Sequence, residues 1–169
     1  MALDTDLNLR ILANLTSQKD LALAASPLDY SKRVQLTNGT GVGKADRLFS
    51  DQRTVALSSS EDLDLVGTLV DDLGVVFSPT RIKMIYVEAL AANTNNVIVG
   101  AAAGTQWAAL LGTTGTVTLR PGAFFLACAG VADATGYVCA AGATDLLKVA
   151  NSGAGTSVDY KIILVGVSV

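Results

Sequence analysis

The sequence predicts an all-β fold, a β-sandwich of the jelly-roll type, on two observations. Segments rich in Val, Ile, Tyr and Thr recur at short intervals, and turns rich in Gly, Asp and Asn separate them. After residue 31 no segment has the pattern of a long helix. This rhythm is typical of sandwiches and jelly rolls. The predicted domains are an extended N-terminal arm over residues 1–31, either wholly extended or containing one strand, and a β-sandwich over residues 32–169.

The arm is expected to be extended because its apolar and polar residues alternate. Within residues 3–15 the alternation places on one face Leu3, Leu7, Leu9 and Ile11. A period of two favours a strand or extended arm over a helix. Residues 17–31 predict a short helical or irregular link, which Pro27 interrupts. A short strand is expected at 33–37, followed by a glycine-rich loop at 38–43.

The strands of the sandwich are predicted from β-branched and aromatic runs between turn signals. They are expected at residues 53–57, 62–66, 81–90, 96–99, 106–111, 116–120, 123–128, 136–140, 146–149 and 158–169. Two of them, 81–90 and 158–169, are apolar on both faces, so each belongs in the middle of a sheet that is covered on both sides. Because a sandwich buries only one face of each sheet, the second cover must come from the arm or from a neighbouring copy.

The composition favours a subunit of an assembly. Hydrophobic residues make up 50% of the chain and charged residues 16%, against about 25% charged residues in an ordinary soluble domain. Of the 27 charged residues, 21 lie at or before Glu88. The C-terminal half therefore has little charge to repel another copy, and large uncharged surfaces usually mark interaction sites. The alternative is a compact, well-buried barrel.

Charge and hydropathy exclude several classes of partner. The net charge is −3 and no basic cluster occurs, so the electrostatic signature of nucleic-acid binding is missing. The acidic first residues do not resemble a secretory signal. Residues 89–119 carry no charge, but Asn, Gln, Thr and Gly interrupt them, so they do not predict a membrane span. We expect a soluble chain made in a cytoplasm.

The two cysteines flank a predicted turn. Cys128 and Cys139 could pair across a hairpin, but synthesis in a cytoplasm favours two buried thiols over a disulfide. The chain has no histidine and no second pair of cysteines. No metal site and no cofactor site are therefore expected.

The motifs that could support catalysis are incomplete. The segment NGTGVGKA at 38–45 has Asn where a phosphate-binding loop begins with Gly, and Ala where it needs Ser or Thr. Carboxylates lie close together in the sequence at Glu61, Asp62 and Asp64 and again at 71–72. We interpret them as residues of a solvated strand edge, which is a simpler explanation than acid–base catalysis or calcium binding. Without histidine, a serine nucleophile lacks its usual base. We expect no catalytic residues and no enzyme.

Six stretches occur together and in order along the chain. They are NGTGVGKADRLFSDQRT (38–54), EDLDLVGTL (61–69), NTNNVIVG (93–100), LRPG (119–122), DATGY (133–137) and LLKVANSGAGT (146–156). In this combination the chain resembles a family of small virion structural proteins of tailed bacteriophages, the capsid cement or decoration proteins. The resemblance covers most of the chain from about residue 38 and, more loosely, the arm.

The resemblance implies a jelly-roll-like β-sandwich on the outside of a phage capsid, made in the bacterial host cytoplasm. Such a protein bridges neighbouring major capsid proteins and stabilises the shell. The expected partners are a second or third copy of the chain, as a homodimer or homotrimer, and the major capsid protein, with no nucleic acid and no membrane. The expected contact residues are Leu7, Leu9 and Ile11 in the arm, together with Trp107.

The alternative is a β-sandwich module associated with a tail fibre or spike that binds glycan or another tail protein. Such a site needs exposed aromatic residues, for which Trp107 and the four tyrosines are the candidates. A lone tryptophan can stack on a sugar or anchor an interface, although it more often belongs to the core.

Overall fold

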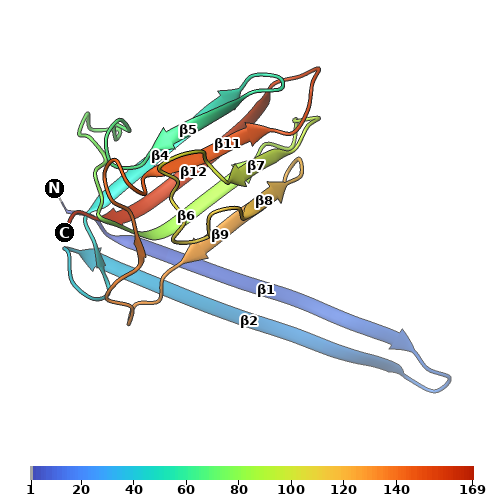
Figure 1. The fold of residues 1–169 in the computed structure, drawn as a ribbon. Coiled ribbons are helices and arrows are strands. Elements are labelled where there is room, and N and C mark those ends of the chain that lie inside the picture. The colour runs from blue at the N-terminus through green and yellow to red at the C-terminus, as the bar shows by residue number, and fades with distance from the viewer. Residues whose placement is uncertain (1) are drawn as a thin grey trace.

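The computed structural model describes residues 2–169, and every regular element within them is a β-strand (Figure 1). The strands form two facing sheets and one long hairpin. The prediction of an all-β sandwich is therefore confirmed. Strand propensity accounts for the strands, because Val, Ile and Tyr dominate the longest buried segments.

One sheet, here called the β6 sheet, has β6 and β12 at its centre. It contains β4 (Arg47–Val55), β6 (Arg81–Ala89), β9 (Phe124–Cys128), β10 (Tyr137–Val138) and β12 (Val158–Val167). β12 lies between β4 and β6, while β9 and β10 pair with successive parts of β6. The two strands that the sequence predicts to be central, 81–90 and 158–169, do occupy the middle of this sheet.

The other sheet, here called the β11 sheet, is made of short strands in the order β5-β11-β7-β8. Their bounds are β5 (Ser60–Asp64), β7 (Val97–Gly100), β8 (Thr116–Leu119) and β11 (Leu146–Asn151). Alternate residues of both sheets meet in one core, in which the β6 sheet supplies Val87, Ile162 and Leu164, and the β11 sheet supplies Val99 and Val149. Each of these five side chains is fully buried.

The N-terminal segment forms a long antiparallel hairpin, here called the arm. β1 (Thr5–Gln18) pairs with β2 (Leu23–Asn38) over its whole length, and β3 (Lys44–Ala45) adds a short parallel pairing to the end of β2. The arm starts beneath the β6 sheet and continues well past the sandwich (blue, Figure 1). The domain boundary predicted at residues 31/32 falls inside β2.

The base of the arm covers part of the outer face of the β6 sheet. Val34 and Leu36 of β2 are buried there against Met84 and Val165, and Leu7 packs at the margin of the same cluster. The second cover that the two-faced strands require thus comes in part from the arm of the same chain. This cover is limited to the base of the hairpin, because the rest of the arm projects beyond the sandwich (Figure 1).

Two local predictions are wrong. Residues 17–31 form no helix or irregular link; apart from the tip at residues 19–22 they are paired strand, because each residue from 23 onward has a partner in β1. Residues 106–111 form no strand either, and only an isolated bridge joins Gln106 to Leu146. A turn follows there, closed by the N–H of Gly112 donating to the carbonyl of Ala108 at 2.9 Å.

Candidate partner-binding surface

The arm has one apolar face, which is half covered and half exposed. Directly paired residues share a face in an antiparallel ladder, so the register unites Leu7 with Val34 and Ile11 with Tyr30. Near the sandwich this face is buried, with Val34 only 7% exposed. Farther out, the same face exposes the side chains Leu9, Ile11, Leu15, Leu28 and Tyr30.

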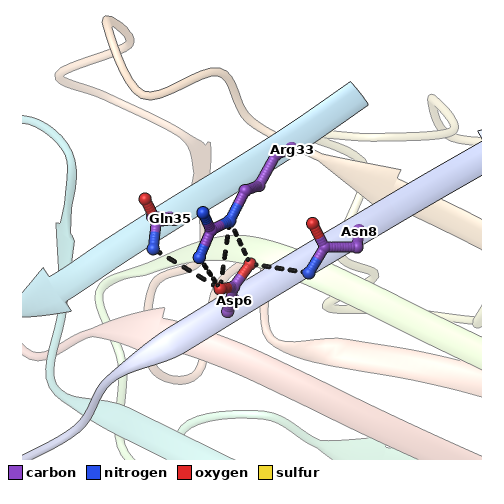
Figure 2. A network of polar contacts seen from close by, with 4 residues as sticks. All are labelled: Asp6, Asn8, Arg33 and Gln35. Atoms are coloured by element: carbon purple, nitrogen blue, oxygen red, sulfur yellow. Dashed lines mark hydrogen bonds and ion pairs between the residues drawn. The ribbon is translucent and has the colours of Figure 1, made fainter. Parts of the chain in front are cut away.

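The opposite face of the arm is mainly polar, and an ion-pair network joins its two strands at the base (Figure 2). The carboxylate of Asp6 accepts hydrogen bonds from Arg33 Nε at 3.0 and 3.1 Å, and also from Arg33 Nη2. Asn8 Nδ2 donates to the same carboxylate at 3.0 Å, and Gln35 Nε2 at 3.4 Å. The hydrogen bonds from Arg33 hold the pKa of Asp6 below its usual range.

A second ion pair lies four residues farther along with the charges exchanged between the strands. Arg10 of β1 donates to Asp29 of β2 through Nε at 3.1 Å and Nη2 at 2.8 Å. Since β1 carries the acid in the first pair and the base in the second, a four-residue slip of the ladder would bring like charges together. The two pairs therefore help to set the register of a hairpin whose exposed faces leave it weakly specified.

The two outer edges of the arm have unpaired backbone over most of their length. Within residues 5–38, β1 pairs only with β2, and β2 pairs elsewhere only at Thr37 and Asn38. Long free strand edges are templates for pairing with another chain. In addition, an isolated two-stranded hairpin is only marginally stable in water. The outer part of the arm is thus a segment that a partner would stabilise.

An apolar groove lies where the arm leaves the β6 sheet. It is lined by Leu7, Asn8, Leu9, Met84, Tyr86, Phe124, Leu126 and Ile163. Phe124 is exposed, and its ring lies 5.7 Å from that of Tyr86, centroid to centroid. A shallower groove continues over β4 and β12, past Tyr86 and Ile163, with an acidic rim formed by Asp51, Asp72 and Glu88 around Lys161.

The predicted contact residues divide into two groups. Leu7, Leu9 and Ile11 lie on the apolar face of the arm, with Leu7 against the sandwich and Ile11 exposed. Trp107 is 5% exposed, and its Nε1–H donates to the carbonyl of Val138 at 2.9 Å. Its ring packs edge-on against Tyr137. The prediction of Trp107 as a contact residue is wrong, because its ring and its donor are both engaged inside the core.

The sequence analysis did not predict the part of the apolar face that β2 contributes. Pro27 and several alanines obscure the alternation around Leu28 and Tyr30, so the sequence predicts an irregular link there. The signal that could have found them is the period-two alternation of Leu28, Tyr30, Val34 and Leu36 with the polar residues between them, which is the pattern of a strand. Pro27 is tolerated because it lies on a strand with a free edge.

The carboxylate clusters have structural roles. Asp64 Oδ1 accepts from the N–H groups of Val66 and Gly67, and Asp71 Oδ1 accepts from those of Leu73 and Val75. Such bonds from Asp to nearby backbone are typical of turns. Within residues 2–169 no group of three or more His, Cys, Asp or Glu side chains has the arrangement to hold a metal ion.

Three comparisons with known proteins found no match: no family model, no curated protein and no solved structure matches this chain. Among the residues that the structure describes, no helix is long and apolar enough to span a membrane. The arm and the adjoining groove are the features of the described residues that bear on function.

Proposed function

We propose that this chain is a non-enzymatic virion structural protein that binds the outside of a phage capsid and stabilises it by bridging major capsid proteins. The observation that carries the proposal is the arm. Its outer part exposes an apolar face and two free strand edges that no residue of the described chain covers. A segment of this kind is suited to a docking partner and serves no evident purpose in a free monomer.

The arrangement of the sandwich strands supports the same proposal. The orders β4-β12-β6-β9 and β5-β11-β7-β8 make successive strands cross repeatedly between the two sheets. We interpret this as a jelly roll, an architecture common in viral capsid proteins. It agrees with the resemblance to capsid cement proteins, which is carried by sequence stretches that lie in the sandwich and its loops.

The mechanism is multivalent clamping. Each oligomer would present two or more binding surfaces to a shell in which the capsid subunits are held at fixed spacing. Once one surface is bound, the next binds at a high effective concentration, so modest contacts add up to a stable attachment. Stabilisation of the shell follows by linkage, because the clamp binds the assembled state and not the separated subunits.

The proposal is tested by measuring, in purified virions that contain the protein, which part of the particle it occupies and how many copies are present. Heads and tails are separated, and the chain is quantified against the major capsid protein by mass spectrometry. The proposal expects it in the head fraction at a copy number comparable with that of the capsid protein. Recovery of only a few copies, or recovery with the tails, would overturn it in favour of a tail fibre or spike module.

A variant sharpens this test by shortening the arm without uncovering the sandwich. Residues 12–29 are replaced by Asn-Gly, which favours a tight hairpin turn, while Leu7, Val34 and Leu36 stay in place. We expect this variant to bind particles much more weakly than the full chain. Undiminished binding to emptied heads would show that the outer arm has no part in attachment.

A further inference from the structure

We propose that two copies of this chain exchange arms, so that the outer apolar face of each arm lies in the apolar groove of the other copy. The inference deepens the proposed function, on whose self-association it rests, by naming the surface and the symmetry. The arm contributes Ile11, Leu15, Leu28 and Tyr30. The groove contributes Tyr86, Phe124 and Leu126 of the β6 sheet.

The receiving surface already packs against an apolar face of the same kind. On the outer face of the β6 sheet, Met84 and Val165 pack against the base of the chain's own arm, through Val34 and Leu36. The outer part of the arm continues that apolar face in the same ladder. Each copy thus carries both a ridge and a matching groove, which is the condition for a closed two-fold interface.

The area that each arrangement would bury distinguishes exchange of arms from simple stacking. The outer arm from residue 9 to 15 and its paired strand make a strip about 23 Å long and about 10 Å wide. Two arms stacked face to face would bury roughly 500 Å², which is well below the ~1,000 Å² that a specific interface should reach. Reciprocal exchange makes two such contacts and buries roughly 1,000 Å² before the strand edges are counted. Exchange is therefore favoured over simple stacking of arms.

The charges of the arm and of the groove are complementary. By register, Lys32 pairs with Leu9 and is the only charged residue on the apolar face of the ladder. The groove that continues over β4 and β12 is rimmed by Asp51, Asp72, Glu88 and Lys161, and because Asp51 is already paired with Arg53, its acidic character comes mainly from Asp72 and Glu88. A basic residue on the ridge thus meets a mainly acidic rim on the groove. Such complementarity helps to select the partner and its orientation.

The decisive test uses two matched double variants of the full chain and measures self-association by sedimentation equilibrium without any capsid. Leu15→Ser with Leu28→Ser changes the apolar face, where the two side chains are 77% and 53% exposed. Leu12→Ser with Leu23→Ser changes the opposite face, where they are 63% and 62% exposed. The two variants therefore remove the same side chains at similar exposure, and neither pair contributes to the core.

We expect the wild-type chain to be a dimer, and we expect the apolar-face variant to weaken dimerisation at least about tenfold. The opposite-face variant should stay within about twofold of the wild type. Equal weakening by both variants, or a wild-type chain that remains monomeric at every concentration, would overturn the inference. Circular dichroism of each variant checks that the sandwich is folded.

Cross-linking separates exchange from stacking. In a Cys128→Ser background, chains with Leu15→Cys are mixed with chains carrying Phe124→Cys and treated with a short bis-maleimide. Exchange predicts cross-links between the two kinds of chain, whereas stacking predicts links only between arms. A dimer with links only between arms overturns the inference. A dimeric chain that is absent from capsids would instead overturn the proposed function and leave the exchange intact.

Discussion

Tyr160 shows how the sandwich accommodates polar groups at the margin of its core. Its side chain is fully buried, and its hydroxyl donates to Glu61 Oε1 at 2.9 Å. Glu61 Oε2 in turn accepts from Arg53 Nη2 at 2.7 Å and Nε at 2.9 Å. This network links β12 and β4 of one sheet to β5 of the other. Burial raises the pKa of Tyr160, so the hydroxyl stays protonated and remains a donor.

The substitution Tyr160→Phe should lower the free energy of unfolding by about 1.5–3 kcal/mol, the usual contribution of a hydrogen bond to a charged group. Urea denaturation followed by fluorescence measures it. Tyr137→Phe is the control, because Tyr137 is only partly buried and contacts Trp107 through its ring. A loss no larger than that of the control would mean that the Tyr160 hydroxyl contributes nothing to stability.

Cys139 should be inert in the folded protein. Its thiol is buried and donates to the carbonyl of Pro79 at 3.2 Å, and burial raises its pKa to about 12. At pH 8 its thiolate would be about a thousandfold scarcer than that of an ordinary cysteine. We expect iodoacetamide to modify Cys139 only after unfolding in guanidinium, as followed by peptide mass spectrometry. Equal rates in folded and unfolded protein would contradict this.

At the scale of the element, the arm depends on charge at its base and on apolar contacts beyond it. The Asp6 network lies where the hairpin leaves the sandwich, and the apolar face farther out lacks a cover in the single chain (Figures 1 and 2). The polar network therefore contributes to order in the arm before any partner binds.

The substitution Asp6→Asn should increase hydrogen exchange at the base of the arm and leave the sandwich unchanged. The pKa of folded Asp6 is lowered from 3.8, so its stabilising effect is complete above that pH. The effect is lost as the pH falls through the folded value. We expect hydrogen exchange in the wild-type arm to approach that of the variant in acid and at high salt, because the Asp6–Arg33 ion pair is exposed to solvent. Exchange that is the same in both proteins at neutral pH would refute this role.

At the scale of the whole molecule, the sequence could predict those features that depend on local alternation. The strands at 81–90 and 158–169 are apolar on both faces, and this pattern correctly predicted both their central positions and the need for a second cover. It predicted only residues 33–37 of β2, because Pro27 and the alanines hide the alternation in the remainder, which is ordered by pairing with residues of β1 up to 31 positions away. For the same reason Trp107 could not be assigned to the core, since its partner Val138 is distant in sequence.

The packing of the arm on the sandwich predicts that the arm has a structural inner part and a binding outer part. Removal of residues 2–31 would take away Leu3 and Leu7 and leave Val34 and Leu36 without their paired strand β1, which weakens the cover over Met84, Ile163 and Val165. Replacement of residues 12–29 by Asn-Gly leaves that cover in place. We therefore expect the first variant to aggregate or to melt several degrees lower, because exposed apolar sheet promotes association.

The melting temperature of the second variant should instead be close to that of the full chain. Both are compared at low concentration, where self-association adds least to the apparent stability. Differential scanning fluorimetry and size-exclusion chromatography on the three proteins measure this. Equal behaviour of the two variants would contradict the division of the arm. If both are as stable as the full chain, the inner part is not needed as a cover. If both variants aggregate or melt at a lower temperature than the full chain, the outer part of the arm contributes to the fold of the single chain and not only to binding a partner.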